Sequence, residues 1–318
     1  MVNIFILILI LIGGMVGIIY SSKLAVMNSA RLASALGISS LVIGVTLVSI
    51  GTDISEIFNS IIASSLGHGD INVGDSVGSI LTQITLVFGL LPFICGTVYI
   101  KRTQFLIIGS CQILALILIF TVVEKGFFTR LDALFMMMSF IFYTLLTYNV
   151  TKTEMLDQID LMEFTDDDKS KVYYLILASV GFLGVAISSY IIIQSIIALS
   201  EHILLDEYLI SFFILSIGTS LPELSVEVTA IKRKKYNIAI GDVLGSCIVD
   251  ASISIAIGNL LFPQEINALL ALPTILYAIL ASLVVIILVS YREKMDKKAG
   301  SILLGMYIFS FILFLWIL

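Results

Sequence analysis

The sequence has few charged residues and few residues that break or cross-link a chain. Only 13% of its 318 residues are Asp, Glu, Lys or Arg, whereas a soluble domain carries about 25%. Hydrophobic residues make up 59% of the chain, and its mean hydropathy is +1.12. A water-soluble fold could not cover that much apolar surface, so the composition predicts a membrane protein whose main partner is the lipid bilayer.

Further absences exclude other classes of protein. Cys95, Cys111 and Cys247 show no paired spacing, which argues against a disulfide framework or a zinc site. The N-terminal stretch MVNIFILILILIGGMVGIIY has no basic segment and no cleavage site, so it is interpreted as a spanning helix rather than a signal peptide. No phosphate-binding loop is present, which excludes an ATP-driven pump. We expect no cofactor, no nucleic-acid partner and no obligate protein partner.

Ten stretches are long and apolar enough to cross a membrane, since a spanning helix needs about 20 mostly apolar residues. They are 2–20, 39–65, 73–95, 103–123, 129–150, 172–198, 208–231, 238–262, 267–290 and 300–318. The sequence therefore predicts an all-α polytopic membrane protein with ten transmembrane helices. The connection 151–171 carries seven Asp or Glu residues. We interpret it as a solvated linker between a first five-helix repeat, 1–150, and a second, 172–318.

The basic residues predict the orientation, because cytoplasmic loops retain Lys and Arg. With the N-terminus outside, fifteen of the seventeen basic residues fall on the inner side, and only Lys125 and Arg130 fall on the outer side. We therefore expect a multi-pass protein of the cell membrane. Both termini should lie outside, and the 151–171 linker should be cytoplasmic.

Two short motifs occur twice at one fixed spacing. Residues 49–56 read SIGTDISE and 216–223 read SIGTSLPE, while 73–79 read VGDSVGS and 240–246 read IGDVLGS. The second copy follows the first by the same number of positions in both pairs, and we call this number the repeat offset. The connection after the first motif has no Lys or Arg, whereas KRKK follows the second at 232–235. The two halves are therefore predicted to cross the membrane in opposite senses, a plan that recurs in secondary transporters.

Each copy of the first motif is predicted to interrupt a helix. Gly-Thr weakens an apolar helix, and Pro222 in the second copy removes a hydrogen-bond donor. Freed carbonyls and Thr hydroxyls are hard oxygen ligands. On the following helices Ser79 and Gln83 share one face, because they are four residues apart. Ser246 and Asp250 repeat that spacing. An all-oxygen set suits calcium or sodium rather than a transition metal.

Four carboxylates are expected at the centre of this site. A carboxylate in mid-membrane costs at least about 2.5–3.5 kcal/mol, so it indicates function. On this ground the candidates are Asp53, Glu56, Glu223 and Asp250.

Three other acidic residues have simpler interpretations. Asp75 and Asp242 lie near the predicted starts of their helices, where a carboxylate can cap free backbone N–H groups. We favour capping for both over direct binding of the cation. Glu227 lies one turn after Glu223. Either it lines an exit path or it pairs with Lys234 or Arg233.

At these residues the sequence resembles the calcium/cation antiporter superfamily, and the prokaryotic sodium/calcium exchangers in particular. The resemblance rests on GTSLPE at 218–223, GDVLGSCIVD at 241–250, their first-half copies and the five-plus-five layout. It implies two inverted five-helix repeats with broken helices 2 and 7, in which helices 1 and 6 slide against the other eight. It also implies a central site that holds one calcium or about three sodium ions in alternation. The ligands implied are Thr52, Glu56, Ser79, Thr219, Ser220, Glu223, Ser246 and Asp250, with the backbone carbonyls of Ser49 and Ser216.

The first half departs from the superfamily pattern. Asp53 and Ser55 stand where Ser and Pro are usual, and Gln83 stands where Asn or Asp is usual. Asp75 and Asp242 stand where Asn is usual. The expected function is still secondary active antiport, not enzymatic catalysis, with Ca²⁺ exchanged for a monovalent cation and Na⁺ as the first choice.

The alternative is a proton- or potassium-coupled divalent-cation exchanger. A channel fits less well, because inverted helix breaks suit alternating access. An intramembrane aspartyl protease is rejected, because its Gly-x-Gly-Asp motif is absent.

Overall fold

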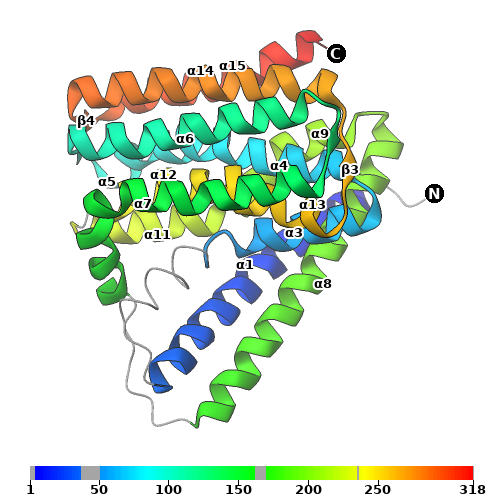
Figure 1. Cartoon of the computed structure of the whole chain (residues 1–318), viewed down its shortest axis with the longest axis horizontal. Helices are drawn as coiled ribbons and strands as arrows, with labels where there is room; N and C mark the ends of the chain where they lie inside the picture. Colours follow the sequence, from blue (N-terminus) through cyan, green and yellow to red (C-terminus); the bar gives the residue numbers. More distant parts are fainter. Residues whose placement is uncertain (1–3, 37–50, 162–169, 235, 318) are drawn as a thin grey trace.

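The structure is a computed structural model that describes residues 4–36, 51–161, 170–234 and 236–317 (Figure 1). It is built almost wholly from helices, as the composition predicts. The first half contains α1 (Ile4–Ala35), α3 (Ile54–Leu66), α4 (Gly69–Leu81), the π-helix η2 (Thr82–Val87), α5 (Phe88–Cys95), β1 (Val98–Tyr99), α6 (Arg102–Val123), β2 (Phe127–Phe128) and α7 (Arg130–Leu161).

The second half repeats this order of elements. It contains α8 (Lys171–Ile203), α9 (Glu207–Ile210), the π-helix η3 (Ser211–Leu215), α10 (Ser216–Thr219), α11 (Leu221–Lys232), α12 (Tyr236–Val249), the π-helix η4 (Asp250–Ser254), α13 (Ile255–Leu261), β3 (Gln264–Glu265), α14 (Ala268–Arg292), β4 (Lys294–Met295) and α15 (Lys297–Ile317).

Nine helical segments of the described residues are long and apolar enough to span a membrane. The predicted second span, 39–65, accounts for the difference from ten. Its described helical part is α3, a shorter apolar helix, and 39–50 lies outside the described residues. The interpretation of 151–171 as a loop is corrected in part, because α7 continues to Leu161. No Gly or Pro interrupts 130–161, so nothing in the sequence ends the helix at the membrane surface.

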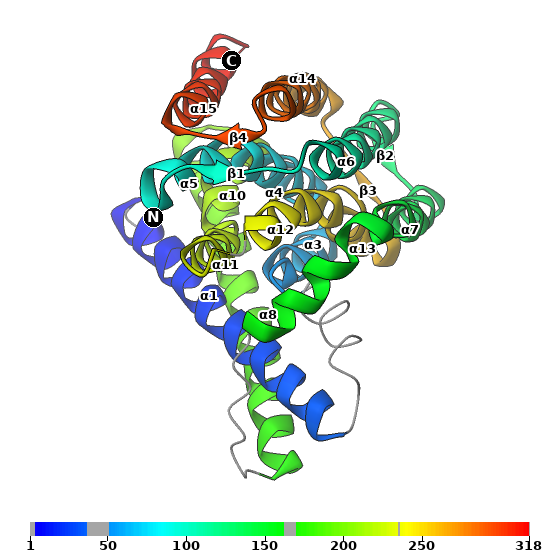
Figure 2. The same cartoon turned by 90° about the vertical axis from the view of Figure 1, so that its left-hand side faces the viewer.

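The spans that carry the predicted site residues lie at the centre of the bundle (Figures 1 and 2). In the apolar stretch of each span, the buried share of the residues is 78% for Gly69–Cys95 and 83% for Ile238–Leu261. For Ile4–Ala33 it is only 22%. Small residues make this possible, because they let backbones approach closely. A Cβ atom on Gly78 of α4 would lie 2.2 Å from the carbonyl oxygen of Phe212 in η3.

α1 and α8 form a pair of long helices at one side of the bundle (Figure 1). Their contact is also built on small residues. A Cβ atom on Gly181 of α8 would lie 2.4 Å from the backbone nitrogen of Ala25 in α1, and one on Gly17 would lie 2.8 Å from the Ser188 hydroxyl. The pair touches the remaining helices through a stacked contact between Phe58 of α3 and Phe182 of α8, whose ring centroids are 6.3 Å apart.

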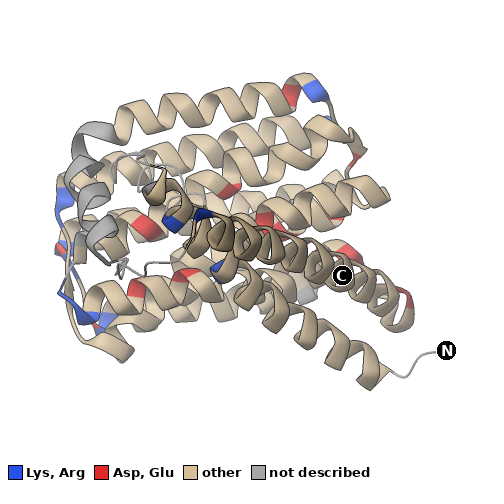
Figure 3. Cartoon of the chain, turned by 90° about the horizontal axis from the view of Figure 1, so that it is seen from below, with Lys and Arg blue, Asp and Glu red and all other residues tan. Residues whose placement is uncertain are grey.

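Two short antiparallel ladders tie the halves together at the ends of the helices. Val98 and Tyr99 of β1 pair with Met295 and Lys294 of β4. β2 pairs with β3 in the same way. Most Lys and Arg residues gather at the end of the bundle that holds β4, whereas several Asp and Glu positions lie inside it (Figure 3). We call the β4 end the basic end.

The close approach at Gly78 predicts a loss of stability on adding one methyl group. Gly78→Ala should lower the melting temperature of the detergent-solubilised protein by about 5 °C or more, because overpacking costs roughly 1–3 kcal/mol. Gly305→Ala in α15 is the matched control, since its Cβ atom would have no neighbour within 4 Å. Equal melting temperatures for the two variants would show that α4 and η3 are not in close contact.

Candidate functional site

The second predicted helix break is present, and the described end of the first motif has nearly the same backbone conformation. Asp53 has φ −83° and ψ 13° and precedes α3. Ser220, which follows Asp53 by the repeat offset, has φ −82° and ψ 2° and separates α10 from α11. This sparsely populated region of backbone conformation is one where active-site residues often lie. In the first half α3 begins after Asp53 without a proline, since the counterpart of Pro222 is Ser55. The preceding residues 37–50 lie outside the described part of the chain.

Three π-helical segments adjoin the site. η2 contains Gln83, η4 begins at Asp250, and η3 ends just before Ser216. A π-helical turn interrupts the regular hydrogen-bond ladder of a helix and is frequent at functional sites. Gln83 and Asp250 are again separated by the repeat offset. The two halves therefore share a π-helical segment after α4 and α12, as well as the backbone conformation of Asp53 and Ser220.

Eleven of the twelve predicted site residues fall within the described part of the chain. All of them are buried except Thr52, which is half-buried. Ser49 lies outside the described residues. The structure brings together Thr52, Asp53, Glu56, Ser79, Gln83, Ser216, Thr219, Ser220, Glu223, Ser246 and Asp250.

The first-half carboxylates are held by hydroxyl groups. Thr52 Oγ1 donates to Asp53 Oδ2 at 3.3 Å, and Ser246 of α12 interacts with the same carboxylate. Ser55 Oγ donates to Glu56 Oε2 at 2.8 Å. The residue that replaces the usual proline therefore fixes the orientation of the neighbouring carboxylate.

Hydrogen bonds across the two halves join the ligands on different helices. Ser79 Oγ lies 3.2 Å from Thr219 Oγ1, and Gln83 Nε2 donates to Asp250 Oδ2 at 3.4 Å. The Ser216 hydroxyl lies 3.2 Å from Thr82 Oγ1. The Ser216 carbonyl accepts the Ser220 N–H at 3.1 Å and the Thr219 hydroxyl at 3.4 Å, so both of its lone pairs are already engaged. Each half thus completes the binding surface of the other.

The site contains buried oxygen atoms that have no hydrogen-bond partner. They are Asp53 Oδ1, Glu56 Oε1, Ser220 Oγ, both Glu223 carboxylate oxygens and Asp250 Oδ1. A buried polar atom without a partner is costly, and an unpaired buried carboxylate costs more. Every partner identified above for the Asp53, Glu56 and Asp250 carboxylates is neutral. Such a group of oxygen atoms is suited to a cation.

A cation at this site would need mixed ligands. No three of the described Asp, Glu, His or Cys side chains lie close enough to hold one metal ion together. Hydroxyl, amide and carbonyl oxygens would therefore complete the coordination. Calcium accepts this mixture, since it takes six to eight oxygen ligands in flexible geometry.

The prediction that Asp75 and Asp242 cap their helices is wrong. α4 begins at Gly69, six residues before Asp75, and α12 begins at Tyr236, six residues before Asp242. Both lie beyond the first turn, where backbone N–H groups are already bonded within the helix.

Asp75 instead lies beside a predicted site residue, Thr219. Its carboxylate accepts from Asn59 Nδ2 at 3.1 Å and from Thr219 Oγ1 at 3.3 Å. The sequence already indicated that Asp75 lies on the same helix face as Ser79 and Gln83, because the three residues are spaced four apart. Asp242 extends the second-half pair in the same way.

Glu227 is fully buried, and neither of its carboxylate oxygens has a hydrogen-bond partner. Its charge interacts with that of Asp242 on the neighbouring helix. Within the described residues no hydrogen bond therefore joins Glu227 to Lys234 or Arg233. Glu227 and Asp242 lie one turn from Glu223 and Ser246, on the side towards the basic end.

Known proteins are similar to this sequence over nearly its whole length. The chain is 29% identical over 298 residues to an uncharacterised membrane protein of Methanocaldococcus jannaschii, covering 93% of each chain. It is 25% identical over 305 residues to the inner membrane protein YrbG of Escherichia coli, covering 93% of this chain and 92% of that one. It is 24% identical over 338 residues to the sodium/calcium exchanger MaX1 of Methanosarcina acetivorans, covering 94% and 96%.

The fold is similar to that of the sodium-calcium exchanger NCX_Mj. The TM-score is 0.61 at 25% sequence identity, over 98% of this chain and 99% of that one. The profile of the sodium/calcium exchanger protein family matches residues 6–149 and again residues 173–316, and the two matches start one repeat offset apart. The resemblance drawn from the repeated motifs is confirmed, and the chain belongs to the sodium/calcium exchanger protein family.

Proposed function

We propose that the protein is a secondary active antiporter that exchanges Ca²⁺ for a monovalent cation, with Na⁺ as the first choice. The observation that carries this proposal is the group of buried oxygen atoms without partners, which both halves contribute at the two helix breaks. A resident hydrogen-bond donor would satisfy these atoms permanently. A transported cation satisfies them only while it is bound, which is what alternating occupancy by two kinds of ion requires.

The balance of charge supports monovalent counter-ions or protons in the cycle. Asp53, Glu56, Glu223 and Asp250 carry four negative charges when all are ionised. One bound calcium leaves these four with a net charge of −2, and three sodium ions leave −1. An ionised Asp75 beside Thr219 makes each of these values one unit more negative. Residual charge in a low-dielectric site is costly, so a proton or a further cation is expected to offset it.

A proton- or potassium-coupled exchanger is the second candidate. It is favoured by Asp53, whose Oδ1 atom is buried without a partner although the superfamily usually has Ser at that position. Asp75 adds a further carboxylate beside Thr219. We infer that these two residues supply the negative charge for an additional monovalent ion or proton.

The proposed mechanism is alternating access between two inverted repeats, 1–150 and 172–318, joined by a cytoplasmic linker at 151–171. Support comes from the matching backbone of the two breaks at Asp53 and Ser220. The concentration of Lys and Arg at the basic end supports a cytoplasmic location for that end (Figure 3).

Neutralising either glutamate at the breaks should stop transport. Glu56→Gln and Glu223→Gln should each lower calcium uptake into proteoliposomes by at least about 100-fold, because an amide replaces neither the charge nor the second ligand oxygen. Glu124→Gln is the matched control, since that side chain is exposed at the end of α6. Near-normal uptake by a correctly inserted Glu56 or Glu223 variant would remove these residues from the site.

Removing the extra carboxylate should change coupling more than calcium transport. Asp53→Ser should keep calcium uptake but flatten its dependence on pH between about pH 6 and about pH 9, or lower the number of counter-ions moved per calcium. The measurements are calcium flux across that pH range and the reversal potential under imposed sodium, potassium and proton gradients. If the wild-type and variant curves superimpose under every gradient, Asp53 takes no part in coupling.

The orientation can be tested by labelling. A cysteine introduced as Asp160→Cys, in a Cys95→Ser background, should react with a membrane-impermeant maleimide only after the cells are opened. Of the three native cysteines, Cys111 and Cys247 are buried, so background labelling should be low. Ready labelling of residue 160 in intact cells would reverse the proposed topology.

A further inference from the structure

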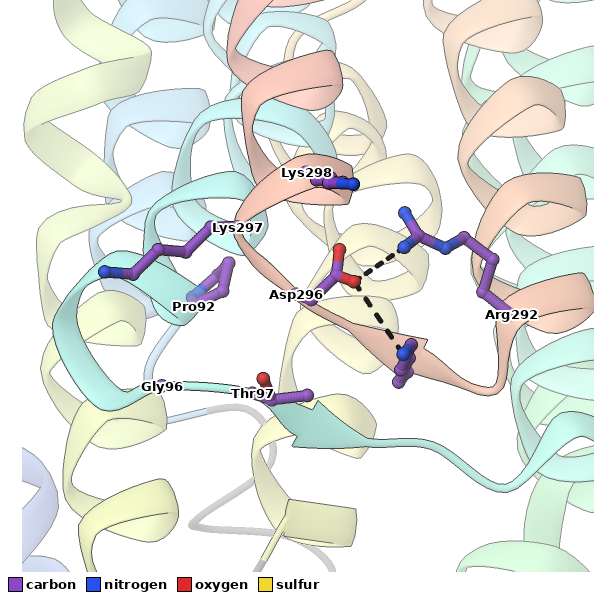
Figure 4. A pocket seen from close by; sticks show the side chains of 8 residues that line it. Pro92, Gly96, Thr97, Arg292, Asp296, Lys297 and Lys298 are labelled. Atoms are coloured by element: carbon purple, nitrogen blue, oxygen red, sulfur yellow. Dashed lines mark hydrogen bonds and ion pairs between the residues drawn. The ribbon is translucent and has the colours of Figure 1, made fainter.

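A pocket lies at the basic end of the bundle, away from the helix breaks (Figure 4). It encloses about 420 Å³ and forms where α5 ends, α14 ends and α15 begins. Its lining residues are Pro92, Gly96, Thr97, Arg292, Lys294, Asp296, Lys297 and Lys298. Four of these side chains are cationic and one is anionic, so the lining carries a net charge of about +3 at neutral pH.

The one carboxylate in the pocket holds two of the cations in place. Asp296 Oδ2 accepts from Arg292 Nη2 at 2.6 Å and lies 4.0 Å from Lys294 Nζ. Its other oxygen accepts the Ala299 N–H at 3.0 Å. This backbone hydrogen bond, aided by the charges of Arg292 and Lys294, lowers the pKa of Asp296. Asp296 is therefore ionised at neutral pH, and it fixes the pocket's shape without cancelling its charge.

The other two lysines leave the positive charge open to a ligand. Lys298 points towards the Arg292 guanidinium, whereas Lys297 extends to the opposite edge of the pocket, beside Pro92 (Figure 4). Asp296 offsets only one of the positive charges that gather here, and the remaining like charges repel one another. A phosphate group suits this place, because a guanidinium has five N–H donors, of which Asp296 engages one, and an ammonium adds a point charge.

The surroundings of the pocket identify the source of the phosphate. Phe93 and Ile94, beside the lining residue Pro92, are 44% and 48% exposed. Tyr99 and Tyr291 are 65% and 85% exposed, and tyrosines concentrate where a membrane meets water. The pocket thus joins exposed apolar surface on one side and exposed cations on the other. A soluble phosphate would use only the cations, whereas a phospholipid would use both.

We propose that this pocket binds the headgroup of an anionic phospholipid, with the phosphate between Arg292 and Lys298 and the acyl chains along Phe93 and Ile94. Basic pockets between membrane helices bind anionic headgroups in this way. The lipid would bridge α5, α14 and α15, and would reinforce the β1–β4 ladder, in which Tyr99 pairs with Lys294. The site uses none of the carboxylates proposed to bind transported cations.

The test measures lipid binding by the purified full-length protein, separately from transport. Phosphatidylglycerol is titrated into the detergent-solubilised protein, and retained lipid is counted by native mass spectrometry. Lys298→Gln should weaken phosphatidylglycerol binding about fivefold, as expected for one basic residue near an anionic surface. Arg292→Gln should weaken it at least as much, although it also removes the partner of Asp296 and so tests stability together with binding.

Lys101→Gln is the matched control, because it removes one positive charge at the same end of the protein without changing the pocket lining. Phosphatidylcholine and inorganic phosphate are the ligand controls. The proposal is supported if phosphatidylglycerol is preferred over phosphatidylcholine, and if only the Lys298 and Arg292 variants lose that preference. Wild-type binding by Lys298→Gln overturns it. Equal competition by millimolar inorganic phosphate would instead make the pocket a site for the free anion and overturn the lipid assignment.

Discussion

The rest of this structure depends on keeping carboxylates inside a membrane although some of their oxygen atoms have no hydrogen-bond partner. Glu223 is fully buried with both oxygens unpartnered, and Asp53, Glu56 and Asp250 each have one oxygen in that state. The cost of such groups in hydrocarbon is several kcal/mol each, so they require shielding from lipid and access to cations. Shielding explains why the Gly69–Cys95 and Ile238–Leu261 spans are the most buried of the described spans. It also explains their small residues, since a larger one at Gly78 would collide with the backbone of η3.

The two halves supply similar backbones but different side chains. Asp53 and Ser220 occupy the same conformation, yet one is a carboxylate and the other a hydroxyl. The Asn59–Asp75 hydrogen bond has no chemical equivalent at the corresponding Val226 and Asp242, because valine has no donor to offer. A duplicated scaffold with unlike side chains offers positions of unequal charge to unlike ions. That inequality is what exchange between a divalent and a monovalent cation needs, because the two must prefer different arrangements of the same ligands.

The sequence was sufficient to predict features that follow from repetition and hydropathy. The fixed spacing of the motifs predicted the break at Ser220 and the matching conformation of Asp53. The cost of a carboxylate in a membrane singled out Glu56 and Glu223, both of which are buried. The π-helical segments could not be predicted, because they depend on how α4 and α12 pack rather than on a local residue preference. Asp75 was missed for a different reason. Its distance from the start of α4 rules out capping, and helix boundaries are the least reliable part of a sequence prediction.

The structure also connects the outlying helix pair directly to the second break. A Cβ atom on Gly218, within the GTSLPE motif, would lie 2.7 Å from the Met15 sulfur of α1. Glycine at this position lets α1 approach the break, and a flexible methionine keeps contact while its partner shifts. α8 touches the first-half segment after the other break through Phe182 and Phe58. A displacement of the α1–α8 pair would therefore act on both halves of the site at once. Since Thr219 next to Gly218 also bonds to Ser79 and Asp75, such a displacement would change hydroxyl and carboxylate ligands together. Coupling between the helix pair and ion binding then needs no contact beyond those already present.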